Sequence, residues 1–128
     1  MVNGAISWAS QQQKTVALSV GEAEYMELAS TGKQAAWLRS ISEEIGYPSH
    51  GPTPLCADNQ VAIFFAINPA VEHQMKHINI RHHYIREQYN EGVIEPFHIT
   101  GEENPADLVT KSLAVIRVEI FRAMIRLM

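Results

Sequence analysis

A long stretch with helical periodicity, from Val20 to Ile45, sets the first limit on the fold. Ser19 followed by Glu22 is a capping-box pattern, which predicts that the helix begins there and which accounts for Glu22. Gly46 and Pro48 stop the periodic pattern at the other end. This is the longest helix that the sequence predicts, and the other elements have to be arranged around it.

Strand-like runs lie on both sides of this predicted helix. Alternating apolar and polar residues at 5–10 and 15–18 predict one strand or a hairpin before it. After it, the apolar run 54–58 predicts a strand that leads directly into a helix from Asn59 to Ile67, closed by Asn68 and Pro69. Strand, sharp turn and helix are therefore predicted in immediate succession.

The second half of the chain continues this alternation. A helical stretch is predicted from about Pro69 to Asn90, and residues 93–99 are predicted as a strand, at an edge of the sheet because of Pro96. Asn104 and Pro105 open a last helical stretch, which we expect to reach Met128 with a break near Ser112. Residues 1–128 are therefore predicted to form one α/β layered domain.

Length and composition exclude several classes of protein. A chain of 128 residues with 46% apolar and 19% charged residues is predicted to fold around a single core rather than to be disordered or fibrous. No apolar run approaches the roughly 18–20 residues of a membrane span, so we expect an intracellular protein, cytoplasmic or nuclear, with no membrane partner. The formal charge of −4 argues against a broad basic face, so any nucleic-acid affinity has to be local or metal-mediated.

Three carboxylates are candidates for a metal site, and each has a simpler explanation. Glu24 falls on the same helical stripe as Leu28, where a carboxylate is costly unless a cation compensates it, but a first-turn Glu is also favoured by the helix dipole. Glu27 lies close to that stripe, so periodicity leaves both glutamates open. Asp58 ends a strand immediately before a helix, where α/β sheets place ligands, yet it could simply cap the helix. Asp107 could be an ordinary first-turn residue of the last helix.

Several short motifs follow one another along nearly the whole chain. They are residues 6–10, 13–19 and 22–26, then Ala36-Trp37-Leu38-Arg39, Asp58-Asn59-Gln60-Val61-Ala62-Ile63, residues 76–78, 80–81 and 83–87, and finally Ala106-Asp107-Leu108-Val109-Thr110-Lys111. In this order they resemble the ribonuclease H domain of copia-type (Ty1/copia) retrotransposon Pol polyproteins.

The resemblance implies a ribonuclease H-like mixed sheet with flanking helices, in a Mg²⁺-dependent enzyme that cuts the RNA strand of RNA–DNA hybrids during reverse transcription. It places the family's catalytic and metal-binding carboxylates on Glu24, Asp58 and Asp107, and it selects Glu24 over Glu27. Two Mg²⁺ ions, or Mn²⁺ ions, about 4 Å apart could then hold the attacking and leaving oxygens in line. The implied partners are the hybrid, recognised through 2′-hydroxyl contacts, and the reverse transcriptase domain of the same polyprotein.

The chain departs from the family pattern at its beginning. The family's first strand, which carries another metal-binding Asp, and its second strand would precede Gly4, so we expect an N-terminally truncated sheet. Groups next to the absent central strand would be uncovered, at about 1–3 kcal/mol for each buried unpaired group. We expect that another segment fills the gap, that the chain rearranges, or that it self-associates through the uncovered sheet. We therefore expect weak cleavage or none, and the alternative is a non-catalytic remnant that only binds nucleic acid or protein.

The remaining chemistry-bearing residues receive simpler interpretations. Four histidines could bind zinc, although surface or packing roles are favoured: His73, His77, His82 and His83. Three arginines are predicted to form a solvated face of the last helix: Arg117, Arg122 and Arg126. Trp8 and Trp37 are predicted as core aromatics, and Cys56 as a small buried hydrophobe.

Overall fold

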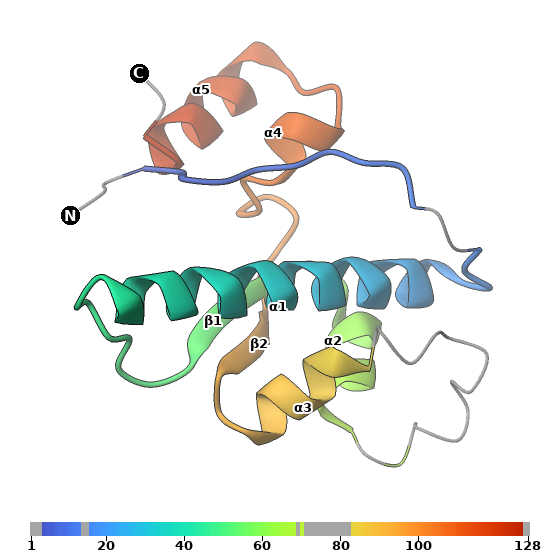
Figure 1. Cartoon of the computed structure of the whole chain (residues 1–128). Coiled ribbons are helices and arrows are strands. Elements are labelled where there is room, and N and C mark those ends of the chain that lie inside the picture. The colour runs from blue at the N-terminus through green and yellow to red at the C-terminus, as the bar shows by residue number, and fades with distance from the viewer. Residues whose placement is uncertain (1–3, 14–15, 69, 71–82, 127–128) are drawn as a thin grey trace. The chain divides into compact units, whose positions relative to one another are not determined.

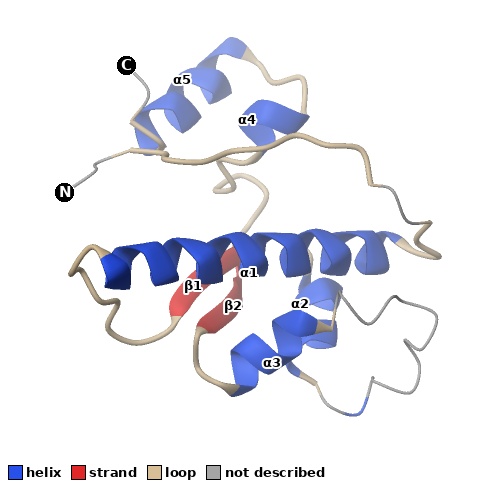
Figure 2. Cartoon of the chain, viewed as in Figure 1, coloured by secondary structure: helices blue, strands red, loops and turns tan. Residues whose placement is uncertain are grey.

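The computed structural model describes residues 4–13, 16–68, 70 and 83–126. Helices outweigh strands in this part of the chain (Figure 2). In chain order the elements are α1 (Val20–Glu44), β1 (Thr53–Ala57), α2 (Gln60–Ile67), α3 (Tyr84–Asn90), β2 (Ile94–His98), α4 (Asp107–Thr110) and α5 (Val115–Met124) (Figure 1). The predicted mixture of helices and strands is confirmed.

The contacts divide the chain into two compact units. Thr15–His98 forms what we call the helix–sheet unit, and Met1–Lys14 together with Ile99–Met128 forms what we call the terminal unit. In the terminal unit the N–H of Ala5 donates to the carbonyl of Ile125 at 3.1 Å, so the first and last segments of the chain meet. The prediction that residues 1–128 make one domain stays a prediction.

Helix α1 begins and ends where local side chains satisfy its terminal backbone groups. At the start, the Glu22 N–H donates to Ser19 Oγ at 3.2 Å, and Glu22 Oε2 accepts from the Leu18 N–H at 2.7 Å. At the end, Gly46 adopts φ of +86°, the left-handed conformation that glycine takes most readily after a helix. The predicted helix, its capping pattern and the role of Glu22 are confirmed.

The sheet of the helix–sheet unit consists of β1 and β2, which pair in parallel with Thr53 opposite Ile94 and Ala57 opposite His98. Leu55 and Ile94 point from these strands into the core, where they meet α1, α2 and α3. The buried side chains of this core are Tyr25, Met26, Leu28, Ala29, Leu55, Ala62, Ala66, Ile85 and Ile94. One face of the two-stranded sheet is therefore covered by the three helices.

Proline lies at the edge of this sheet, as predicted. The Thr53 N–H donates to the Val93 carbonyl at 2.9 Å, and this bond determines which alternate residues of β2 direct their backbone groups toward β1. In this arrangement the backbone N and C=O of Pro96 face away from β1, so the hydrogen bonds between the two strands do not need an N–H at this position. The edge position predicted for Pro96 is confirmed.

Most of the other predicted elements agree with the structure. The strand, turn and helix around Asp58 appear as β1 and α2, with Asn59 and Asn68 as the caps of α2. The last helical stretch is interrupted between α4 and α5, close to Ser112, but it begins at Asp107 with Ala106 as its N-cap and not at Asn104 and Pro105 as predicted. Asn104 Oδ1 instead accepts from the Ala106 N–H at 3.2 Å, in the turn that precedes α4. Of the helix predicted over 69–90, the described part is α3, and the remainder lies outside the described residues.

The strand or hairpin predicted at 5–10 and 15–18 is wrong for the described residues. No strand is found there, and four of its large apolar side chains are between 60% and 85% exposed: Ile6, Trp8, Val16 and Leu18. A strand needs a neighbour that accepts its ladder hydrogen bonds, and β1 and β2, the strands of the described chain, pair with each other instead. Alternation alone could not reveal whether the described part of the chain supplies such a neighbour.

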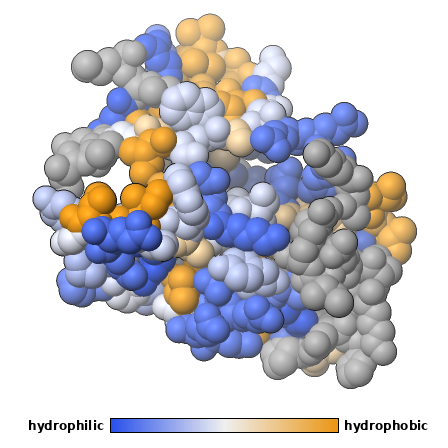
Figure 3. Space-filling model, viewed as in Figure 1, coloured by the Kyte–Doolittle hydropathy of each residue, from blue (hydrophilic) through white to orange (hydrophobic). Residues whose placement is uncertain are grey.

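Three residues predicted to be buried are exposed. Trp8 and Trp37 are 68% and 58% exposed, and Cys56 lies on the surface. Cys56 follows the buried Leu55, so alternation along β1 turns it to the other face of the sheet. On the side of the molecule shown in Figure 3, hydrophobic residues lie in separate patches among hydrophilic ones. Among the described residues, no helix combines the length and apolar character that crossing a membrane would require.

Candidate metal site

Asp58 lies between the carboxyl end of β1 and the first turn of α2. The helix cap is its neighbour, because Asn59 Oδ1 accepts from the N–H groups of Val61 and Ala62 at 2.9 and 3.2 Å. The N-cap residue of α2 is therefore Asn59 and not Asp58. The Asp58 side chain is half-buried at the end of a parallel strand, where open α/β sheets bind their ligands.

Glu24 lies in the amino-terminal part of α1, close to the turn that contacts α2. A Cβ placed on Gly21 would lie 2.7 Å from Val61 Cγ1, so the two helix backbones approach closely at this point. Gly21 precedes Glu24 by less than one helical turn, and Val61 follows Asp58 by a similar interval. The helix–sheet unit therefore brings the chain segments of both carboxylates to one region.

The extent of burial distinguishes Glu24 from Glu27, which the helical periodicity of the sequence could not do. Glu22 is buried and is used by the helix start. Glu24 is half-buried, whereas Glu27 is exposed. Position on the folded helix therefore favours Glu24 over Glu27 on grounds independent of the sequence resemblance.

Asp107 belongs to the terminal unit and is the first residue of α4. Its side chain is almost fully buried at 8% exposure, and its Oδ1 lies 2.8 Å from Lys111 Nζ, one turn later. The Asp107 N–H donates to the Asn104 carbonyl at 3.2 Å. The buried charge of Asp107 thus has a cationic partner, as buried carboxylates require.

The three predicted carboxylates are therefore divided between the units. Glu24 and Asp58 belong to the helix–sheet unit and Asp107 to the terminal unit. Within the part of the chain that the structure describes, no three His, Cys, Asp or Glu side chains gather closely enough to hold a metal ion. The donor set itself suits Mg²⁺, because carboxylate oxygens are the hard ligands which that ion prefers.

The sequence also offered histidines and arginines as candidate functional residues. Three of the four histidines considered for zinc, His73, His77 and His82, lie outside the described residues. Arg122 and Arg126 are exposed on and after α5, as predicted for a solvated face. Arg117 is half-buried instead, with its guanidinium 5.6 Å from the centre of the Phe121 ring and a hydrogen bond of 3.1 Å to the Gly101 carbonyl.

Tyr25, which follows Glu24, makes a contact that the sequence did not indicate. Its hydroxyl lies 3.0 Å from His83 Nδ1, and its side chain is fully buried. Burial raises the pKa of this hydroxyl to about 12, against the opposing effect of the nearby Arg86 guanidinium. The available signal was the place of Tyr25 on the helix face that also carries Ala29 and Gly32, which predicts burial but not its partner.

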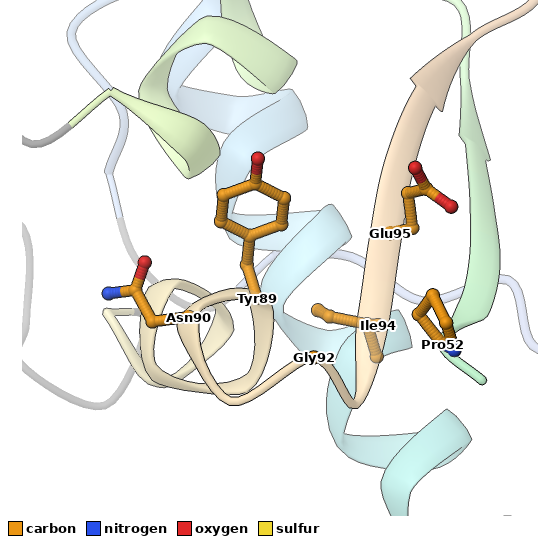
Figure 4. Close-up of a pocket in the computed structure, with 6 residues that line it drawn as sticks. All are labelled: Pro52, Tyr89, Asn90, Gly92, Ile94 and Glu95. Carbon is orange, nitrogen blue, oxygen red and sulfur yellow. The ribbon is translucent and has the colours of Figure 1, made fainter.

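A shallow pocket lies at the opposite end of the strands from Asp58. Figure 4 shows Tyr89 on one side of it and Glu95 and Pro52 on the other, with Gly92 and Ile94 between them. Pro52 precedes β1, whereas Asp58 follows that strand. The pocket is therefore separate from the candidate metal site.

Three curated proteins show extensive similarity to this chain. A retrovirus-related Pol polyprotein from transposon TNT 1-94 of Nicotiana tabacum is 38% identical over 122 residues, which cover 95% of this chain and 9% of that protein. Retrovirus-related Pol polyproteins from transposons RE2 and RE1 of Arabidopsis thaliana are 34% and 37% identical over 91% and 85% of this chain, and 8% and 7% of their own lengths. The chain spans less than a tenth of these relatives. No protein-family model matches it. No solved structure matches it either.

Proposed function

We propose, on the premise that this chain is homologous to a short part of retrotransposon Pol polyproteins, that it is ribonuclease H-related and built to hydrolyse the RNA strand of RNA–DNA hybrids. The motif order along the chain supports this choice among the activities of a polyprotein. The parallel strands β1 and β2, with helices packed on one face, are compatible with a ribonuclease H-like sheet.

The observation that carries the proposal is the position of Asp58. Asn59 is the N-cap of α2, and Asp58 lies one residue earlier, directly after the carboxyl end of β1. The contact between Gly21 and Val61 holds the neighbouring part of α1, with Glu24, against the start of α2. Two carboxylates on converging segments are what a divalent-cation site needs first.

In this proposal Glu24, Asp58 and Asp107 hold Mg²⁺ or Mn²⁺ through their carboxylate oxygens. When bound, the metal supplies Lewis-acid activation of a phosphodiester. The proposal requires the terminal unit to present Asp107 to the same ions, and Lys111 then has to share or release that carboxylate. Because the chain carries a net charge of −4, these cations also offset its repulsion of the nucleic acid.

The proposed partners follow from the same chemistry. An RNA–DNA hybrid is recognised by shape and by 2′-hydroxyl contacts rather than by base readout, so no broad basic surface is required. The reverse transcriptase part of a Pol polyprotein is the proposed protein partner, in the cytoplasm or the nucleus where reverse transcription takes place.

A labelled RNA–DNA hybrid incubated with Mg²⁺ or Mn²⁺ tests the proposal. The chain is compared, alone and within a longer Pol polyprotein, with its Glu24→Gln, Asp58→Asn and Glu27→Gln variants. We expect the first two to lower cleavage by about 100-fold or more, and the exposed Glu27 variant to leave it within about twofold. Equal cleavage by the unsubstituted protein and the Asp58 variant would show that this site assignment is wrong.

A binding role without catalysis is the second candidate function. It is favoured by the ion pair between Asp107 and Lys111, which satisfies the third carboxylate without a metal. Under this alternative the chain binds the labelled hybrid in a mobility-shift assay but never cleaves it, even within the longer polyprotein and with Mn²⁺ present.

A further inference from the structure

We propose that Tyr25 is a positioning residue for the carboxylates Glu24 and Asp58, acting through its hydroxyl contact with His83. This inference rests on the proposed function, since it concerns the same metal site. Tyr25 does not itself bind the metal in this proposal. It fixes how the three helices around the site are placed.

The hydroxyl contact joins two segments that are 58 residues apart in sequence, the first turns of α1 and the start of α3. Tyr25 is fully buried, so its hydroxyl cannot exchange this partner for bulk water. A buried hydroxyl that lost its partner would cost about 1–3 kcal/mol, which makes the contact selective for one placement of α1. Glu24 precedes Tyr25 in the same turn of α1, so the placement of that turn also sets where the Glu24 side chain points.

The ring of Tyr25 makes a second, independent contact. It packs edge-to-face against Phe65 of α2, with ring centres 6.2 Å apart and an interplanar angle of 83°. Helix α2 is the element that begins immediately after Asp58 and Asn59. One side chain therefore touches both the helix that follows Asp58 and the helix that follows His83.

A third contact closes the connection between these helices. Arg86 of α3 donates a hydrogen bond to the carbonyl of Asn68, the residue that caps the end of α2. Helices α1, α2 and α3 are thus linked pairwise by Tyr25 to His83, Tyr25 to Phe65, and Arg86 to Asn68. Removing only the hydroxyl of Tyr25 loosens one link while the ring contact stays.

Mn²⁺ binding can be measured from the electron paramagnetic resonance signal of the free ion, and this measurement does not require cleavage. The Tyr25→Phe variant keeps the buried ring, and Tyr47→Phe is the matched control because Tyr47 is 74% exposed. We expect Tyr25→Phe to weaken Mn²⁺ binding roughly 10-fold, as loss of a supporting hydrogen bond does at metal sites, and Tyr47→Phe to leave it unchanged. His83→Phe should weaken binding similarly, and combining it with Tyr25→Phe should add little.

The outcomes separate this inference from the proposed function. If Glu24→Gln and Asp58→Asn abolish Mn²⁺ binding but Tyr25→Phe does not alter it, the positioning role is wrong and the proposed site stands. If the unsubstituted chain shows no specific Mn²⁺ site, or if both carboxylate variants bind Mn²⁺ as tightly as the unsubstituted chain, the proposed site fails and the positioning role fails with it. A merely structural role for Tyr25 would lower the melting temperature without changing Mn²⁺ affinity below that temperature, and this result would also overturn the inference.

Discussion

Replacing Gly21 and Gly32 by alanine, one at a time, should change the stability of the protein in opposite directions. Both glycines are buried in α1, and glycine in a helix costs about 1 kcal/mol relative to alanine. Helix propensity alone therefore predicts that both variants are more stable. The difference comes from what the added methyl group would meet.

At Gly32 the new Cβ would lie 3.5 Å from Ile85 Cδ1 and 3.5 Å from Ile94 Cδ1, which are ordinary van der Waals distances. The helical gain is then retained, and the buried methyl group adds to it, so we expect Gly32→Ala to stabilise by about 1 kcal/mol. At Gly21 the Cβ would lie 2.7 Å from Val61 Cγ1 and 3.2 Å from Val61 Cβ. Overpacking of this kind costs about 1–3 kcal/mol, and a β-branched valine has few other rotamers, so Gly21→Ala should destabilise by about 1 kcal/mol.

Thermal unfolding of the full chain, followed by circular dichroism, measures both effects. A change of about 1 kcal/mol corresponds to roughly 3–5 °C in Tm for a chain of this size. Shortening the obstructing side chain provides the control, because Gly21→Ala should cost little in a Val61→Ala background. If both alanine variants shift Tm in the same direction, the close approach of α1 and α2 inferred at Gly21 is wrong.

Three further predictions concern other contacts. The pKa of Tyr25 is raised from 10.0 to about 12 in the folded protein, so the unfolded chain loses the Tyr25 proton at lower pH. The free energy of unfolding should therefore fall between pH 10 and 12 by up to roughly 2 kcal/mol. Urea unfolding measures this decrease, and the Tyr25→Phe variant should not show it. Cys56 is exposed, although partial burial raises its pKa, so a maleimide should label the folded chain without denaturant and faster as pH rises; a requirement for denaturant would contradict the orientation of β1. Gly92 adopts φ of +70°, so Gly92→Ala should destabilise by about 1 kcal/mol in urea unfolding, and an unchanged midpoint would refute that conformation.

Local chemistry explains why much of the fold could be predicted. The start of α1 at Ser19, its end at Gly46 and the start of α2 directly after Asn59 each depend on partners only a few residues away. The succession of β1, Asp58 and α2 follows from the same kind of signal. The predicted hairpin failed because a strand depends on a partner segment, which alternation does not reveal.

The candidate site was predictable in its residue types but not in its arrangement. Motif order selected Glu24, Asp58 and Asp107, and periodicity alone left Glu27 open. Three-dimensional packing shows that Glu24 is half-buried and Glu27 exposed, and that Asp107 is paired with Lys111. Whether a residue is buried depends on which other segments cover it, and the periodic pattern of one helix does not specify those segments.

The sequence by itself determined where α1 and α2 begin and end, because those limits depend on hydrogen bonds within one or two turns. Tertiary structure decided which side chains meet, as between Tyr25 and His83, or the turn at Gly21 and Val61. It also decided that Cys56 and Trp37 face outward. Such contacts join segments far apart along the chain, and they form only when the helices pack together.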